Sequence, residues 1–380
     1  MEPSGVTLSV RHLRAPAVVV ALIVVLAAAC QGPAPTPSAA PAATTPPARA
    51  TAPAPAATAA PSAGLPGPIK VVGTAPVITR SMFPGRTATL PGAISVAADG
   101  TYHAWVIAFA QTPGTQEIHY LTSPDALTWT EVPDASLEGL SEGLGNPGAL
   151  PTSVLEDGDG WVMYYVGTLA TEQRGWDLWR ATAPTAAGPW TRRDEPVMRR
   201  GPADAWDSGA LDFPTVLATD DGYTMVYSGW NPAVPDGGSI GFATSDDGIA
   251  WTKLDDPATT AAPFAESDPI VEPGLCGDFD DRAVQQPRVV ALPDRLVMAY
   301  AGYTGPLESR ATVGYADSLD GGRTWTCAWP GPALDTAGLP DGFVHTLTAF
   351  HHGERAALLV EWFANGGTDI WLADLGVSPP

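Results

Sequence analysis

A repeated unit constrains the fold of this chain more than any other feature. Its clearest copy spans residues 205–253. An aromatic-Asp pair leads to a Pro, a short apolar run, an acidic-Gly turn, the stretch TMVYSG, a loop, IGFATS, a turn at Asp246-Asp247-Gly248 and a final WTK. These segments predict four short strands separated by tight turns.

Two sets of equivalent residues mark the repeat. The tryptophans at the fourth strands follow one another at intervals of 61, 61 and 74: Trp129, Trp190, Trp251 and Trp325. The first-strand prolines follow one another at intervals of 60, 63 and 73: Pro91, Pro151, Pro214 and Pro287. A fifth copy offers a second strand, AALLVEWF, and a third strand, DIWLADL, but no fourth strand. Such internal self-similarity is typical of radial repeat architectures.

The strand missing from the fifth unit has a candidate at the other end of the repeat region. Residues 69–80, IKVVGTAPVITR, end like a unit, because APVITR compares with EPVMRR at 195–200 and DPIVEP at 268–273. We therefore expect residues 69–72 to supply the outer strand of the last unit. Five four-stranded antiparallel units closed in this way form an all-β, five-bladed propeller without an open edge.

Residues 1–30 have the pattern of an export signal. Residues 15–29 are apolar and uncharged, and they follow Arg11, His12 and Arg14. The stretch ends LAAAC, which resembles a bacterial lipoprotein signal with Cys30 as the lipidated residue. Ala27-Ala28-Ala29 also suits an ordinary signal peptidase, although the Leu stands one place further from the Cys than in the usual lipoprotein pattern.

Residues 31–68 are almost entirely Ala, Pro, Thr and Ser, with Arg49 as the single charge. Such a segment buries too little apolar surface to fold, so we expect a disordered linker. The propeller then occupies residues 69–380. Together these segments predict an exported, lipid-anchored protein at the cell surface, on the extracytoplasmic face of the plasma membrane.

The charge balance restricts the partners. The chain carries a net charge of −22, and Glu2 is the only acid within residues 1–68. An acidic domain repels nucleic acid and anionic lipid, so we expect no nucleic-acid partner and membrane contact only through the lipid anchor. Neutral or cationic ligands fit this surface, although an acidic composition without functional meaning explains it equally well. We expect a monomer.

Cys276 and Cys327 remain besides Cys30. Two such cysteines in an exported protein most often form a disulfide. No His lies at ligand spacing from either of them, so we expect no metal site there.

The turns before three fourth strands read SPDALTW, SDDGIAW and SLDGGRTW and resemble the Asp-box. We expect Asp125, Asp247 and Asp320 to cap these turns, with a Gly at positive φ and a Trp packed between units. Asp207 and Asp280 precede a first-strand Pro at the same distance, so they also recur and are predicted to be structural.

The recurrent aromatic-Asp, Pro, MxYxG, IGxATS and DGxxW pattern resembles the five-bladed glycosidase superfamily that includes glycoside hydrolase families 43, 32, 62 and 130. The resemblance covers the whole domain. It implies that the first strand of each unit lines a central channel, and that residues just before its Pro face the mouth of that channel. It also implies an oligosaccharide or polysaccharide as the ligand.

Alignment on the first-strand Pro gives two rings of mouth positions. Two residues before it stand Thr89, Ala149, Asp212, Gln285 and, in the fifth unit, His345; one residue before it stand Leu90, Leu150, Phe213, Gln286 and Thr346. Family 43 implies carboxylates in the first three units, and only Asp212 is present. Hydrolysis of a glycosidic bond normally requires two carboxylates. Asp212 is the candidate catalytic acid, and Glu361 in LLVEWF is the candidate second acid.

The resemblance also suggests residues that contact substrate. They are Gln285, Gln286, His345, Phe213, Trp230 and Trp362, and packing between units is the competing role for the aromatic residues. His345 can alternatively hold a channel cation or water; no other cofactor is expected.

Three functions follow from this pattern. One is a glycosidase, the second is a glycan-binding propeller without catalysis, and the third is a protein-interaction propeller. A second carboxylate that shares the mouth with Asp212 favours the first.

Overall fold

The computed structural model describes residues 68–110, 116–145, 148–158, 160–171, 175–231, 233, 237–305, 310–353 and 355–376. The predicted signal segment 1–30 and all but the last residue of the predicted linker lie outside this part. Among the described residues, no helix has the length and apolar character to cross a membrane.

Each repeat folds into an antiparallel group of strands, here called a blade. Blade 1 contains β2 (Arg86–Val96), β3 (Tyr102–Ala110), β4 (Gln116–Ser123) and β5 (Thr130–Glu131); blade 2 contains β6 (Leu150–Asp157), β7 (Gly160–Gly167), β8 (Asp177–Ala183) and β9 (Thr191–Arg192). Blade 3 contains β10 (Ala210–Thr219), β11 (Gly222–Trp230), β12 (Gly238–Ser245) and β13 (Thr252–Lys253); blade 4 contains β15 (Ala283–Ala291), β16 (Leu296–Tyr303), β17 (Thr312–Ser318) and β18 (Thr326–Cys327). Blade 5 contains β20 (Phe343–His352), β21 (Arg355–Ala364), β22 (Gly367–Asp374) and β1 (Ile69–Val71). The fourth strands of blades 1 to 4 are short and begin directly after the repeat tryptophans.

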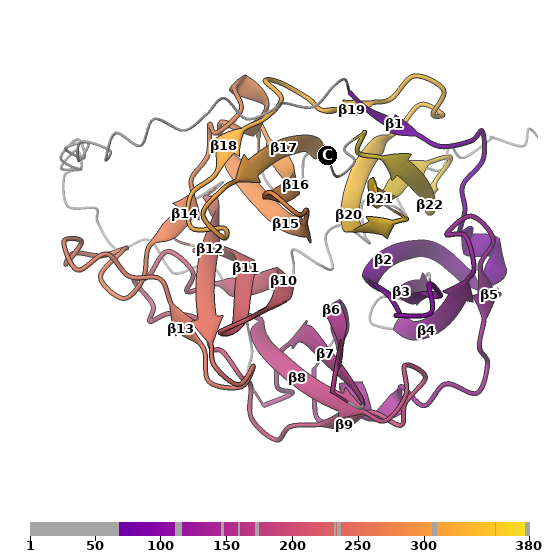
Figure 1. Cartoon of the computed structure of the whole chain (residues 1–380), viewed down its shortest axis with the longest axis horizontal. Coiled ribbons are helices and arrows are strands. Elements are labelled where there is room, and N and C mark those ends of the chain that lie inside the picture. The colour runs from indigo at the N-terminus through magenta and orange to yellow at the C-terminus, as the bar shows by residue number, and fades with distance from the viewer. Residues whose placement is uncertain are drawn as a thin grey trace, which may run out of the picture.

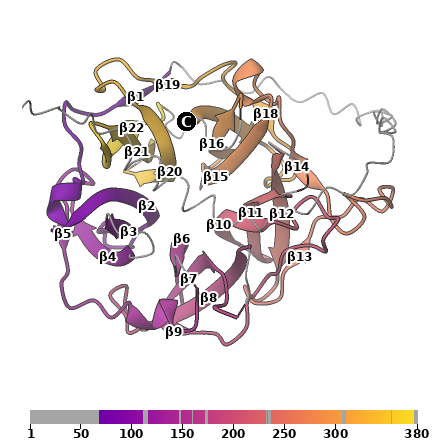
Figure 2. The same ribbon diagram turned by 180° about the vertical axis from the view of Figure 1, so that it is seen from behind.

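The first strands of the blades surround a central axis (Figures 1 and 2). Contacts join them in a closed cycle, from β2 to β6, β10, β15, β20 and back to β2. Blades 3 and 4 also meet through one parallel pair between Gly238 and Ala283. The predicted all-β propeller of four-stranded antiparallel blades is confirmed.

The N-terminal strand closes the last blade, as predicted. Lys70 pairs with Asp374, and Val71 pairs with Ala373, in antiparallel register. The outer edge of β1 is covered in turn by a short parallel strand, β19 (Leu334–Asp335), which the repeat pattern did not predict. This extra strand shields an edge that the four-stranded plan leaves open.

The three segments that were compared in the sequence occupy equivalent places. Ile78 pairs with Ile370, Met198 pairs with Leu178, and Val271 of β14 (Pro269–Val271) pairs with Ile240. Each segment therefore returns to the third strand of a blade. The short 3-10 helices are η1 (Arg80–Met82), η2 (Glu138–Ser141) and η3 (Asp278–Asp280).

The second strands form the core, because both of their faces are covered by neighbouring blades. Their methionines are fully buried: Met163, Met225 and Met298. The predicted disulfide between Cys276 and Cys327 is confirmed, with the two Cα atoms 5.2 Å apart across a sequence separation of 51. It joins the loop before blade 4 to the last strand of that blade.

Candidate functional site

Asp212 lies near the start of β10, one of the strands around the axis. Its side chain is buried, with 8% of the residue exposed. The main-chain N–H of Phe213 donates a 2.8 Å hydrogen bond to its Oδ1. No partner stands at Oδ2 among the described residues, so this oxygen is the free acceptor or donor of the group.

A β-bulge in blade 3 sets the direction of the Asp212 side chain. The pairing with β11 shifts between Asp212 and Thr215, and Phe213 within the bulge has a φ of +42°. Blade 4 repeats the bulge between Gln285 and Arg288, where Gln286 has a φ of +55°. Left-handed backbone at residues other than Gly costs about 1–3 kcal/mol and concentrates at functional sites.

Arg288 crosses the centre of the ring. It is almost completely buried, and its Nε donates to the carbonyl of Leu347 at 2.8 Å while Nη1 donates to the carbonyl of Thr152 at 3.0 Å. Its guanidinium lies 5.0 Å from the ring centroid of Phe213. One cation of β15 thus holds β20, β6 and β10 together, while its Nη2 has no partner among the described residues.

The electrostatics make Asp212 a neutral acid. Burial raises the pKa of Asp212 to about 8, although the hydrogen bond from Phe213 and the Arg288 cation oppose the shift. Burial also lowers the pKa of Arg288 to about 10, against the attraction of Asp212. Tyr303 lies within electrostatic reach, since burial and Asp212 together raise the pKa of its hydroxyl. A carboxyl that keeps its proton at neutral pH can donate that proton.

The fifth blade corrects one alignment. Its bulge lies between Val344 and Leu347, with His345 and Thr346 inside it opposite Glu361. Val344 therefore matches Asp212 in the pairing register, and His345 matches the following residue, Phe213. The sequence alignment was one place out here because the fifth unit has no Pro to mark the bulge.

His345 and Glu361 form a pair at the start of blade 5. The imidazole Nδ1 lies 2.9 Å from Glu361 Oε2, and the Thr346 hydroxyl donates to the same oxygen at 2.9 Å. Glu361 is buried, whereas 28% of the His345 side chain is exposed. Glu361, the candidate second acid, therefore stands behind His345, and the imidazole is the group nearer to solvent.

Hydrogen bonds connect Asp212 to this pair through blade 4. Ser228 is the register partner of Asp212, and its hydroxyl accepts a 2.7 Å bond from the main-chain N–H of Gln286. The Gln286 side chain donates to the carbonyl of His345 at 3.2 Å. The structure thus brings together Asp212, Gln286, His345 and Glu361, four residues that the sequence singled out.

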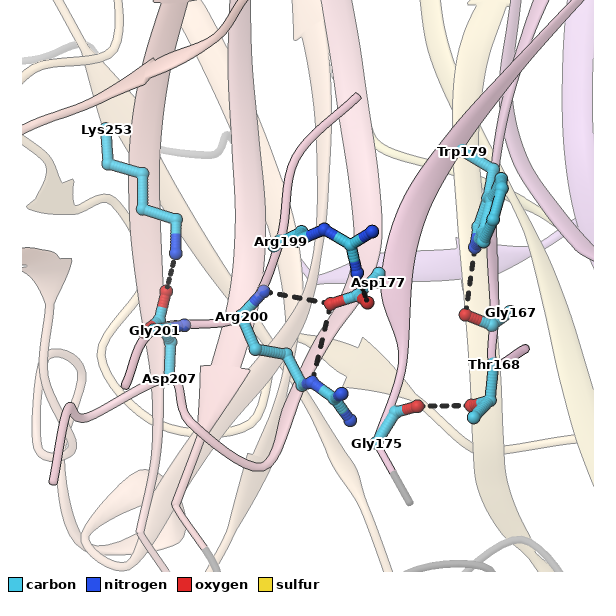
Figure 3. Close-up of polar contacts among 10 residues, drawn as sticks. All are labelled: Gly167, Thr168, Gly175, Asp177, Trp179, Arg199, Arg200, Gly201, Asp207 and Lys253. Atoms are coloured by element: carbon cyan, nitrogen blue, oxygen red, sulfur yellow. Dashed lines mark hydrogen bonds and ion pairs between the residues drawn. The ribbon is translucent and has the colours of Figure 1, made fainter. Parts of the chain in front are cut away.

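Asp207 and Asp280 belong to the scaffold in this geometry. Asp207 is fully buried and accepts hydrogen bonds from the Lys253 ammonium and the Gly201 main-chain N–H (Figure 3). Asp280 is also fully buried and accepts from the Tyr300 hydroxyl at 2.6 Å and from the Cys276 N–H at 3.0 Å.

The aromatic residues before these two acids explain the glycines of the repeat. Trp206 stacks on Tyr227, and Phe279 stacks on Tyr300. A Cβ at Gly229 would lie 2.5 Å from Trp206, and a Cβ at Gly302 would lie 2.7 Å from Phe279. Only Gly leaves room for this packing, so the motif MxYxG records a steric requirement.

Asp125, Asp247 and Asp320 hold three hairpin turns in equivalent roles. The Oδ1 of each accepts hydrogen bonds from two main-chain N–H groups that follow it, at distances from 2.8 to 3.1 Å. These bonds lower the pKa of the Asp125 and Asp247 carboxyls. Such side-chain bonds to the backbone are typical of turn-forming Asp.

Blades 1 and 2 present no acid at the mouth positions. Thr89 and Ala149 are fully buried, and Leu90 and Leu150 are nearly so. Thr89 exchanges hydrogen bonds with Thr368 of β22. These positions join neighbouring blades.

The aromatic candidates differ in access. Trp362 is buried, and its indole N–H donates to the carbonyl of Pro340 at 3.0 Å, which favours packing. Phe213 is buried against Arg288, and Trp230 is half-buried at the end of β11. Gln285 is half-buried beside Gly238. The roles of these residues toward substrate stay predictions.

Sequence reasoning did not single out Arg288 or Ser228. Arg288 had a detectable signal, because the residue after the first-strand Pro is Gly92, Thr152 and Thr215 in the preceding units. A charge in a column of small residues on an inner strand marks a departure. Ser228 had no such signal.

No cluster of three or more His, Cys, Asp or Glu side chains suited to a metal ion occurs in the part of the chain that the structure describes. The channel cation near His345 stays a prediction.

Comparisons with known proteins place the fold. No protein-family model matches the chain, and no curated protein matches it. A structure of a BT0996 RGII complex has a TM-score of 0.59 at 16% identity, and the match covers 82% of this protein and 92% of that one. A putative glycoside hydrolase from Bacteroides ovatus ATCC 8483 has a TM-score of 0.56 at 16% identity, covering 82% and 97%.

A thermostable family-43 glycoside hydrolase gives the same result, with a TM-score of 0.53 at 14% identity and coverage of 78% and 94%. This chain has the fold of the β-propeller glycoside hydrolases. The predicted structural resemblance is confirmed, and at these identities it extends to the fold alone.

Proposed function

We propose that this chain is a glycoside hydrolase-like, carbohydrate-active protein that binds an oligosaccharide or polysaccharide at the mouth formed by blades 3 to 5. Asp212 is the proton donor to the glycosidic oxygen. The observation that carries the proposal is the buried, neutral carboxyl of Asp212 at the start of an inner strand, with Oδ2 free among the described residues. A raised carboxyl pKa is what a general acid needs at neutral pH.

The test is a screen of the purified protein against aryl furanosides and pyranosides, with Asp212→Asn as the comparison. General acid catalysis contributes about 100- to 10,000-fold to a rate, so the variant is expected to lose at least about 100-fold in kcat. Equal rates in the two proteins would remove Asp212 from the mechanism.

A second candidate is a glycan-binding propeller without catalysis. The buried Thr89 and Ala149 favour it, because they occupy positions where the resemblance implies carboxylates. Binding on a glycan array without hydrolysis of any bound sugar identifies this function. Absence of all glycan binding would leave a protein-interaction propeller.

We also propose export and anchoring through a lipid on Cys30, which rests on the residue pattern of positions 11–30. Metabolic labelling with a fatty-acid analogue tests it: wild type is labelled and Cys30→Ala is not. Labelling of both proteins, or of neither, would contradict the anchor.

A further inference from the structure

The pair formed by His345 and Glu361 has the geometry of an oriented proton carrier. A carboxylate can only accept a hydrogen bond, so the 2.9 Å contact requires a proton on Nδ1 of His345. In the neutral imidazole, Nε2 then carries the free lone pair. Nε2 has no partner among the described residues, while 28% of the side chain is open to solvent.

Glu361 is fixed so that it can hold this ring. Its Oε2 also receives the Thr346 hydroxyl, and only 2% of its side chain is exposed. A buried carboxylate that binds one ring nitrogen selects the tautomer and orientation of the other. Direct contact of Glu361 with a sugar is unfavourable, because His345 and Thr346 occupy its accessible oxygen.

The position of the ring relative to Asp212 is set by blade 4. Gln286 donates its main-chain N–H to Ser228, the register partner of Asp212, and donates its side-chain amide to the carbonyl of His345. One residue therefore ties both sides of the mouth together. Arg288 repeats this link one layer deeper, through the carbonyl of Leu347.

We propose that His345 is the second proton-transfer group of this site and that Glu361 positions it. This inference rests on the proposed function. It answers the shortage of carboxylates, since an imidazole replaces the second acid as general base.

The step balances as an inverting hydrolysis. His345 Nε2 takes a proton from a water molecule, whose oxygen forms a bond to the anomeric carbon. The bond from that carbon to the glycosidic oxygen breaks, and Asp212 delivers its proton to the departing oxygen. The site is left with an imidazolium and a carboxylate, which exchange one proton through solvent. Attack by water on the face opposite the leaving group inverts the anomeric carbon.

The protonation states agree with these roles within a narrow pH range. Burial lowers the pKa of His345, but the Glu361 carboxylate more than offsets this and raises it above its ordinary value of 6.5. The charged groups at the mouth that face this region are Glu361 on β21, Asp212 on β10 and Arg288 on β15. The base becomes available above the raised pKa of His345, and the acid is lost above the pKa of about 8 of Asp212. The rate is therefore bell-shaped in pH.

The test uses the full chain and a substrate that the screen identifies. His345→Gln is expected to lower kcat at least about 100-fold with little change in KM. Its matched control is His351→Gln, an exposed His further along β20, which is expected to stay within about twofold of wild type. Glu361→Gln is expected to move the acidic limb of the profile to lower pH, because His345 loses its carboxylate and its pKa falls.

A nitrogen NMR titration of the imidazoles adds a readout that needs no activity and no buried variant. His345 in the wild-type protein is expected to keep Nδ1 protonated and to titrate above 6.5. Full kcat in His345→Gln, an unmoved acidic limb in Glu361→Gln, or titration of His345 below its ordinary value would overturn the inference while hydrolysis by wild type preserves the proposed function. Failure of wild type to hydrolyse any glycoside would overturn both.

Discussion

Blades 3 and 4 have the same internal scaffold and secure it differently. In each, an aromatic-Asp pair packs on the Tyr and Gly of the second strand. In blade 3, Lys253 of the fourth strand neutralises Asp207. Cys327 holds the equivalent position in blade 4, opposite Ala316 as Lys253 is opposite Ala243, and it forms the disulfide instead.

The mouths of the two blades differ in a more informative way. Both form a bulge with positive φ before the Pro, but blade 3 has Asp212 where blade 4 has Gln285. Blade 4 shows that the bulge needs no acid. Asp207 and Asp280 recur because the scaffold requires them, whereas Asp212 stands at a place where the fold accepts an amide. Its carboxyl is therefore free to serve function.

The largest effect is expected from breaking the ion pair of blade 3. Asp207→Ala leaves the Lys253 ammonium without its partner, and loss of one member of a buried pair costs about 3–5 kcal/mol. Urea denaturation measures the change in unfolding free energy. Asp207→Ala with Lys253→Met is expected to recover part of the loss; a double variant no more stable than the single one would show that the ammonium is not the cause.

The lock of blade 4 comes next. Replacing Cys276 and Cys327 together by Ser is expected to lower the unfolding free energy by about 3 kcal/mol, since the bridge restricts a closed loop in the unfolded chain. Wild type treated with a reductant should show the same loss. An unfolding curve that ignores the reductant would mean that the bridge contributes nothing to stability.

A smaller effect separates two neighbouring acids of the blade 3 turn. Asp247→Ala removes two hydrogen bonds to the backbone at an exposed site and is expected to lower the melting temperature by about 2 °C. Asp246→Ala is the matched control, because Asp246 is exposed and makes no hydrogen bond among the described residues. Equal melting temperatures for the two variants would argue against the capping role.

Near pH 4, Asp212→Asn is expected to have the smallest effect on stability, and this effect grows with pH. The folded protein keeps the Asp212 proton up to a pKa of about 8, while the unfolded chain releases it near 3.8. Stability is therefore fully present below about pH 4 and is lost as pH rises toward 8. The neutral Asn removes this loss, so the variant should match wild type near pH 4 and exceed it near pH 8. A constant difference between these pH values would contradict a neutral Asp212.

The repeat pattern predicted the strands, the closing strand and the disulfide because each depends on local pattern or pairing. The bulge of blade 5 escaped prediction, since no Pro marks it, and His345 was placed one position out. Which member of the His345–Glu361 pair faces solvent depends on strand register and burial, which composition and spacing do not reveal. The path of Arg288 across the ring depends on the assembled blades.

The central claim is that Asp212 keeps its proton at neutral pH. Infrared difference spectroscopy between wild type and Asp212→Asn tests it directly. A protonated-carboxyl band that Asp212→Asn lacks is predicted at pH 7, and it should disappear as the pH passes about 8. A carboxylate band at pH 7, with no protonated carboxyl lost in the variant, would contradict the claim.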